Sequence, residues 1–228
     1  MSTRAVFLPP MRPVFPFQIC NQHLLISGDR YIFWEEKKAL ILSDLHLGKS
    51  AHFRKNGIGV SGNIFREDIA RLSDAVRRFN PSVLILVGDL FHSSHNREHE
   101  DFLRWRNDFP VPAIELVKGN HDILSKDFYS SAEISVHPMQ YELDEFSFVH
   151  DRECAPEIGS YCFTGHIHPG ISIYGNARQR LSFPCFYFGK DHAILPAFGR
   201  FTGTHPIKAH PNDHVFAIAD GSILPLHV

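Results

Sequence analysis

Apolar runs that end in short polar segments constrain the fold of this chain more than any other feature. The runs occupy residues 39–42, 82–87, 113–117, 146–149 and 161–164. Uninterrupted apolar runs of this length are typical of strands that are buried on both faces. The polar segments that follow are Asp44-Leu45-His46, Gly88-Asp89, Gly119-Asn120-His121-Asp122, His150 and Gly165-His166-Ile167-His168. Because ligands of open α/β sheets bind beyond the carboxyl ends of the strands, we expect these segments to converge on one site.

The rest of the sequence predicts an α/β fold in one domain. Residues 64–79 place apolar side chains at spacings of four, three, four and three, which predicts one apolar helix face. A second helix is expected at residues 98–108. Short strands are expected at 24–26, 31–34, 184–188, 193–195, 215–219 and 222–224. We therefore expect two packed sheets with flanking helices over residues 1–228, with residues 1–17 forming a proline-rich N-terminal arm.

Length, charge and cysteine spacing narrow the class of protein. The 228 residues suffice for a domain with its own core, and the net charge of -2 argues against nucleic-acid binding through bulk electrostatics. No stretch approaches the roughly 18 apolar residues of a membrane span. The four cysteines lack C-x-x-C spacing, and prolines interrupt the apolar N-terminus, so we expect a cytoplasmic protein with reduced cysteines.

The polar segments contain the ligand types of a divalent metal site. Side chains two residues apart after a strand point the same way, so Asp44 and His46 can reach one ion, as can the two histidines of the last segment. The side-chain oxygen of Asn120 also suits a hard divalent ion. A lone histidine such as His150 is more often a hydrogen-bonded core residue, and it becomes a candidate because the other segments converge. Oxygen and imidazole ligands without thiolate suit Mn, Fe, Zn, Co or Ni.

The order of these motifs resembles that of the calcineurin-like metallophosphoesterases. The series D-x-H, G-D, G-N-H-D, H and G-H-x-H is complete between Asp44 and His168, with no ligand substituted. The residues around the motifs are similar to the bacterial branch of ligase-associated DNA damage response endonucleases, called PdeM. These residues are found at 43–49, 88–93, 184–186, 196–199 and 201–203. The resemblance implies a four-layer α-β-β-α sandwich with two mixed sheets.

The resemblance also implies which residues hold two metal ions. One ion would be held by Asp44, His46, Asp89 and His168, and the other by Asp89, Asn120, His150 and His166. Asp89 would bridge the two ions, and the family favours Mn. Two such ions activate water and clamp the oxygens of a phosphate.

Further residues near the motifs are candidates for catalysis and substrate binding. His121 would stabilise the transition state or protonate the leaving oxygen, and Asp122 would orient His121 or act as a capping carboxylate. Lys49, Arg54 and Lys55 would contact a nucleic-acid backbone, or form an ordinary solvated charge cluster. His92 would lie in a solvated loop, with a position that lines the cleft as the alternative.

These expectations support three functions. The leading one is an enzyme, a two-metal phosphodiesterase that acts on DNA as a repair endonuclease, with association with a DNA ligase or helicase implied by the resemblance. The second is a phosphodiesterase or phosphomonoesterase that acts on a cyclic nucleotide or nucleotide. The third is a non-catalytic scaffold, which the complete set of ligands disfavours.

Overall fold

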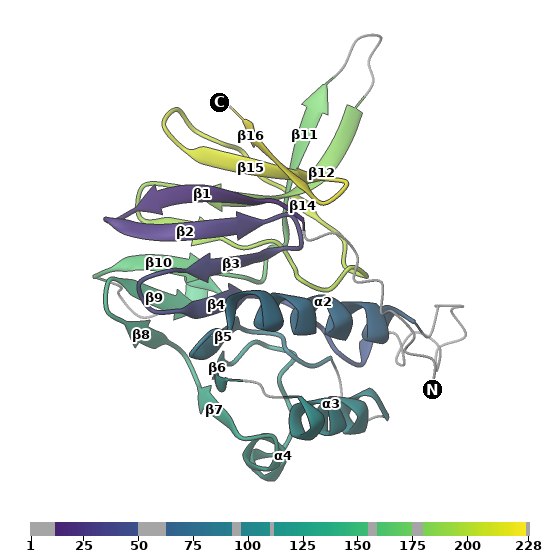
Figure 1. The fold of residues 1–228 in the computed structure, drawn as a ribbon. Coiled ribbons are helices and arrows are strands. Elements are labelled where there is room, and N and C mark those ends of the chain that lie inside the picture. Colours follow the sequence, from purple (N-terminus) through teal and green to yellow (C-terminus); the bar gives the residue numbers. More distant parts are fainter. Residues whose placement is uncertain are drawn as a thin grey trace, which may run out of the picture.

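Two packed β-sheets organise the computed structural model of the chain, which describes residues 12–49, 63–92, 97–109, 112–154, 159–174 and 180–226. The first sheet has the order β1-β2-β3-β4-β5-β6-β7 (Figure 1). Its strands are β1 (Val14–Ile19), β2 (Gln22–Ser27), β3 (Tyr31–Trp34), β4 (Ala39–Leu42), β5 (Val83–Val87), β6 (Ala113–Val117) and β7 (Ile134–His137). The strands β4 to β7 are parallel, while β1 to β4 are antiparallel, so the sheet is mixed.

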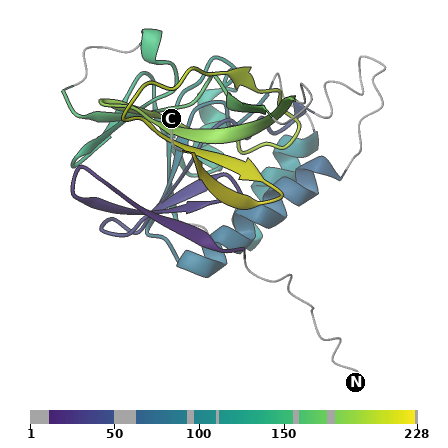
Figure 2. The same cartoon turned by 90° about the horizontal axis from the view of Figure 1, so that it is seen from above.

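The second sheet lies against the first and is also mixed. Its main path runs β14-β11-β12-β13-β10-β9-β8, with β15 and β16 joined to it through β12. Its strands are β8 (Tyr141–Leu143), β9 (Phe146–Val149), β10 (Tyr161–Thr164), β11 (Pro169–Tyr174), β12 (Arg180–Phe188), β13 (His192–Ile194), β14 (His205–Pro206), β15 (His214–Ala219) and β16 (Ser222–Leu226). Seen from above, the purple strands of the first sheet and the green and yellow strands of the second form separate layers (Figure 2).

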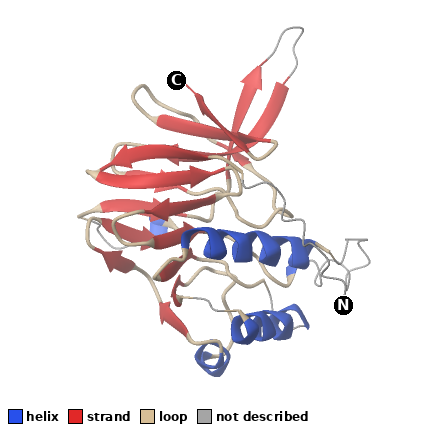
Figure 3. Cartoon of the chain, in the orientation of Figure 1, coloured by secondary structure: helices blue, strands red, loops and turns tan. Residues whose placement is uncertain are grey.

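Three α-helices pack on the first sheet, on the face away from the second sheet (Figure 3). They are α2 (Ile64–Phe79), α3 (Arg97–Asp108) and α4 (Lys126–Ser131). The helix α2 has the predicted bounds and ends where Asn80 adopts a left-handed conformation, with φ 43°. No helix among the described residues has the length and apolar character that crossing a membrane would require.

Successive side chains along the strands of the first sheet point to opposite faces of the sheet, and each face carries an apolar core. Leu40 and Leu42 of β4 face the helices, whereas Ala39 and Ile41 face the second sheet. Aromatic side chains from the second sheet fill the space between the sheets, and Phe163 packs against the ring of Phe146 at 4.9 Å. Both faces of the central strands are therefore buried, as their uninterrupted apolar sequences require.

The expected α/β sandwich with two mixed sheets is confirmed. Two details differ from the expectations. Residues 14–17, expected in an extended arm, belong to β1 and pair with β2, and Phe15 packs on Phe216 of the second sheet. The α-helices of the described residues all cover the first sheet. The outer face of the second sheet packs instead against Ile207 and Ala209 of a non-helical segment.

Candidate metal centre

The predicted ligands lie just beyond the carboxyl ends of five strands, and both sheets contribute. Asp44 and His46 follow β4, Asp89 follows β5 and Asn120 follows β6, all in the first sheet. The second sheet supplies His150 after β9, and His166 and His168 after β10. Since β4, β5 and β6 are parallel, as are β9 and β10, their carboxyl ends point to one edge of the sandwich. The candidate site therefore forms where the two sheets meet.

Five of the seven ligand candidates have a left-handed backbone. The φ angles are 53° at Asp44, 50° at His46, 50° at Asp89, 66° at His166 and 52° at His168. Such angles are uncommon outside glycine, and they persist at positions that the surrounding structure holds firmly. Backbone hydrogen bonds hold the first two turns together, from the Asp44 amide to the Gly88 carbonyl at 3.1 Å and from the His46 amide to the Asp89 carbonyl at 2.9 Å.

Asp44, His46 and His168 form a first group of converging side chains. The Nε2 atom of His168 lies 3.3 Å from Asp44 Oδ1 and 3.3 Å from His46 Nε2. One ligand atom of each residue lies within 4.8 Å of the others. Asp44 is fully buried, and the donors are the carboxylate and imidazole groups that bind divalent transition metals.

Asp89, Asn120, His150 and His166 form a second group. Its centre is His150 Nε2, which lies 3.4 Å from Asp89 Oδ2, 3.3 Å from Asn120 Oδ1 and 3.3 Å from His166 Nδ1. The other nitrogen of His150, Nδ1, donates to the Val87 carbonyl at 3.1 Å, which leaves Nε2 to face the group. The two groups together contain every residue that the family resemblance implied as a ligand.

The carboxylate of Asp89 belongs to both groups. Its Oδ2 atom lies 3.8 Å from His46 Nε2 and 3.4 Å from His150 Nε2. Its Oδ1 atom accepts the backbone amide of His121 at 2.9 Å, which fixes the orientation of the carboxylate. One oxygen thus faces the space between the groups, as a bridging ligand must.

Burial and charge set the protonation of these side chains. Burial lowers the pKa of His46 to about 3, so its imidazole is neutral, the form that binds metal. Burial alone would lower the pKa of His150, but its hydrogen bond to Asp89 and the nearby carboxylates raise that pKa to about 9. Burial would likewise raise the pKa of Asp89, and the hydrogen bond with His150 and its positive charge lower it to about 2.

Among the glycines of the motifs, Gly88 and Gly119 make the closest approaches to ligand side chains. A Cβ atom on Gly119 would overlap Asp89 Oδ1, and one on Gly88 would overlap the imidazole of His150. Gly88 also has φ 79°, which a side chain would strain. These close approaches explain why both motifs need glycine beside the polar residue.

Asp151 is a residue of this centre that the sequence analysis missed. Its Oδ2 atom lies 3.9 Å from His166 Nε2, while the other ring nitrogen of His166 faces His150. A carboxylate near the outer nitrogen of a ligand histidine orients the ring and increases its basicity. The position of Asp151 directly after His150 was the available signal.

His121 and His92 lie beside the first group. The ring centroid of His121 is 5.3 Å from that of His46 and 4.5 Å from that of His92. His121 is partly exposed, so its imidazole can meet a bound molecule. His92 also borders the first group, with its ring centroid 5.5 Å from that of His46.

Asp122 binds backbone amides of two loops. Asp122 is fully buried, and its two oxygens accept the backbone amides of Phe91 at 3.0 Å and Gly119 at 2.9 Å. Burial raises the pKa of Asp122 to about 7. Of the two alternatives for Asp122, the geometry favours the capping carboxylate, which ties the loop after β6 to the loop after β5.

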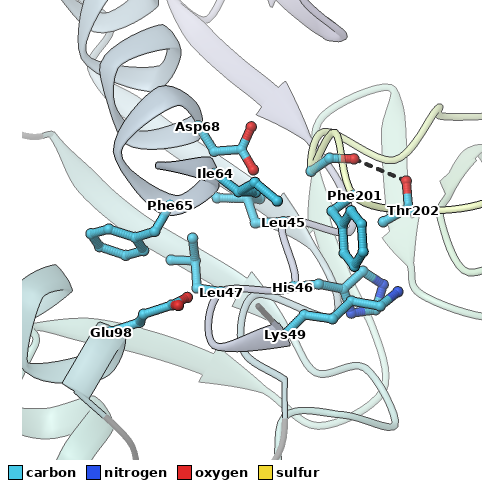
Figure 4. Close-up of a pocket in the computed structure, with 11 residues that line it drawn as sticks. Leu45, His46, Leu47, Lys49, Ile64, Phe65, Asp68, Glu98, Phe201 and Thr202 are labelled. Carbon is cyan, nitrogen blue, oxygen red and sulfur yellow. Dashed lines mark hydrogen bonds between the residues drawn. The ribbon is translucent and has the colours of Figure 1, made fainter. Parts of the chain in front are cut away.

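Lys49 borders a small pocket beside His46. The close-up shows Lys49, His46 and Phe201 next to one another in the lining of this pocket (Figure 4). Burial lowers the pKa of Lys49, and the charges of Asp89 and Asp44 oppose that shift. Arg54 and Lys55, the other predicted basic contacts, lie outside the described residues.

The chain is similar to known proteins in sequence and in fold. The model of the calcineurin-like phosphoesterase family matches residues 37–197. The crystal structure of Pseudomonas putida nuclease MPE is similar, with a TM-score of 0.78 and 26% sequence identity, covering 93% of this chain and 100% of that chain. No curated protein matches the chain.

Replacing Gly119 by Ala should impair the centre without unfolding the protein. The added methyl group would displace the Asp89 carboxylate, and a misplacement of about 1 Å can cost about 100-fold in rate. The measurement is Mn-dependent hydrolysis of a chromogenic phosphodiester. Gly159→Ala is the matched control, because a Cβ atom added at Gly159 would have no other atom within 4 Å. Equal rates for the two variants would contradict the role assigned to Gly119.

Replacing Asp89 by Asn should abolish turnover and remove stabilisation by metal. The amide retains the size of the side chain but loses the charge that attracts ions to both groups. We expect Mn to raise the Tm of the wild-type protein and to leave that of the variant almost unmoved. Asp74→Asn, at an exposed helix position, is the control and should respond as the wild type does. A full Tm response in the Asp89 variant would refute the shared position of this carboxylate.

Proposed function

Because the chain belongs to the calcineurin-like phosphoesterase family, we propose that it is a two-metal phosphodiesterase that cleaves DNA within the strand. A metal-dependent phosphoesterase follows from the family, and the similar nuclease supports a nucleic-acid substrate. The observation that carries the proposal is the position of Asp89 Oδ2, within 4.0 Å of an imidazole from each group. DNA repair, a cytoplasmic location and an association with ligase or helicase stay predictions from the sequence.

The side chains of the two groups fit divalent ions. They offer carboxylate, amide and imidazole donors that converge on one another. In the proposal, Asp44, His46 and His168 hold one ion, Asn120, His150 and His166 hold the other, and Asp89 contacts both. When bound, such ions offset the charge of the phosphate and activate the attacking water. Mn is the proposed metal, with Fe, Zn, Co and Ni as alternatives.

The charge of the ligand set favours an anionic substrate. Asp44 and Asp89 are its two carboxylates, and two divalent ions would bring about four positive charges. The excess positive charge attracts a phosphate to the exposed side of the centre, where Asn120 and His166 are solvent-accessible. A substrate phosphate can therefore approach the centre from solvent on this side.

His121 is the proposed general acid. Its ring stands beside His46 but outside both ligand groups, so its proton is available to the leaving oxygen. The hydrogen bond from its backbone amide to Asp89 Oδ1 couples its position to that of the bridging carboxylate. Asp122 acts as a positioning residue for this loop through the Gly119 and Phe91 amides.

The surroundings of His46 favour a nucleic acid over a smaller phosphate ester. Phe201 is 39% exposed and lies with Lys49 next to His46 (Figure 4). An aromatic ring next to a cation is a common arrangement for stacking a base and contacting its phosphate. Lys49 and Phe201 would thus bind the nucleotide next to the cleaved bond.

A smaller phosphate ester is the second candidate substrate. A cavity of about 240 Å³ lies beside the second group, lined in part by Lys118, Met139, Asp151 and His166. Its size suits a nucleotide more than a polymer. A cyclic-nucleotide phosphodiesterase or a phosphomonoesterase would use this cavity.

Hydrolysis of a chromogenic diester and of the matching monoester separates the candidates. The metal-stripped protein is reconstituted with Mn and given bis(p-nitrophenyl) phosphate or p-nitrophenyl phosphate. A nuclease-type site should show the higher kcat/KM for the diester and should cleave single-stranded or duplex DNA. Preference for the monoester would contradict the proposed function and support a phosphomonoesterase.

The effect of His121→Asn should depend on the leaving group of the substrate if His121 is a general acid. We expect kcat to fall about 10²- to 10⁴-fold on DNA, whose alkoxide leaving group needs a proton. The loss should be much smaller on bis(p-nitrophenyl) phosphate, since p-nitrophenolate leaves without one. Equal losses on both substrates would contradict the role of an acid and indicate that His121 positions the substrate.

A further inference from the structure

A cavity lined by arginines lies outside the metal centre. It has a volume of about 510 Å³ and contains Arg12, Arg30, Arg71 and Arg200 in its wall. These arginines come from four parts of the chain: the residues before β1, the turn between β2 and β3, the middle of α2, and the segment after β13. The turn between β15 and β16 closes the cavity with Asp220 and Gly221. The fold thus brings four guanidinium groups to one hollow.

The nearby carboxylates do not neutralise this arginine cavity. Asp29 Oδ1 lies 3.3 Å from Arg12 and 3.9 Å from Arg200, so a single carboxylate serves both. Asp68 pairs with Arg71 at 2.6 Å. With Asp220, three carboxylates face four guanidinium groups. A positive charge remains, so the lining is suited to an anion.

Arg71 is paired at two of its three guanidinium nitrogens, because Nη1 donates to the Asp29 carbonyl at 2.8 Å and Nη2 donates to Asp68 and to the Phe198 carbonyl, both at 2.6 Å. Burial and the charges of Arg71 and Arg200 lower the pKa of Arg30 to about 10. The Nε atom of Arg71 is buried and has no hydrogen-bond partner within the part of the chain that the structure describes. Guanidinium groups match the geometry of phosphate oxygens, so phosphate is the anion that this lining fits best.

The segment 197–199 separates the arginine cavity from the metal centre. On the cavity side, Arg30 Nη1 donates to the carbonyls of Ala197 at 3.0 Å and Gly199 at 3.2 Å. On the other side, the Gly199 amide donates to the Asp44 carbonyl at 3.1 Å. The cavity is therefore one backbone segment away from a metal ligand. Arg200 and Phe201 continue this segment toward the pocket beside His46.

We propose that the arginine cavity binds a phosphate of the nucleic-acid strand at a distance from the cleaved bond. The inference rests on the proposed function, because it takes the strand to cross the segment 197–199 between the metal centre and the cavity. Two points of attachment explain how a chain with a net charge of -2 holds a polyanion. They also give an advantage to substrates that are long enough to reach both points of attachment.

The test measures binding of a short fluorescein-labelled single-stranded oligonucleotide to metal-stripped protein over a series of salt concentrations. The variant R12Q/R200Q removes two guanidinium groups of the cavity wall and keeps Arg30, which donates to the carbonyls of the segment 197–199. We expect its Kd to rise about tenfold and the slope of log Kd against log salt to fall by about 0.7 for each phosphate that the variant no longer binds. Asp29→Asn removes the competing carboxylate and should lower the Kd.

Arg104→Gln is the matched control, since Arg104 is an exposed arginine of α3 with carboxylate partners of its own. Wild-type Kd and slope in R12Q/R200Q would overturn the inference, as would equal weakening by Arg104→Gln, which would indicate bulk charge. A Kd for Asp29→Asn above that of the wild type would also contradict it. If the wild-type protein neither hydrolyses the diester nor binds the oligonucleotide, the proposed function fails together with the inference. If the wild-type protein hydrolyses the diester but R12Q/R200Q binds the oligonucleotide as the wild type does, only the inference is refuted.

Discussion

The carboxylate of Asp89 is the feature on which the rest of the site depends. One of its oxygens faces imidazoles supplied by both sheets, at 3.8 Å and 3.4 Å, and the other is fixed by the His121 amide. Its position requires that the carboxyl ends of β5 and β9 meet, that Gly119 lack a side chain, and that the loop after β6 turn back toward β5. The packing of the two sheets therefore positions a single oxygen between two groups of ligands.

The backbone at the strand ends explains how so many polar groups fit in a buried space. Left-handed conformations at five ligand positions turn the side chains inward, while the amides of Asp44 and His46 remain bonded to neighbouring loops. Asp122 completes this arrangement by accepting two further amides. Each ligand carboxylate and each of the loop amides named above therefore has a backbone partner or a neighbouring ligand. Contacts within the protein hold these loops in place.

Local patterns predicted the parts of the structure that depend on short stretches of sequence. The helix at residues 64–79 follows from apolar periodicity, and the strands before Asp44, Asp89 and His150 follow from uninterrupted apolar runs. The convergence of the ligands follows from strand direction, and their division into two groups came from the family resemblance. The role of Asp151 depends on its contact with His166, and the arginine cavity depends on contacts between segments that are distant in the sequence. The role of Asp122 required the position of the Phe91 amide, 31 residues earlier.

The number of ions bound to each chain tests the central claim most directly. Metal-stripped protein would be dialysed against Mn, and the bound metal would be determined by elemental analysis against protein concentration. This account predicts two ions per chain. It also predicts that replacing the single residue Asp89 by Asn weakens the binding of both ions. One ion per chain, or loss of one ion alone in that variant, would contradict a carboxylate shared between two metals.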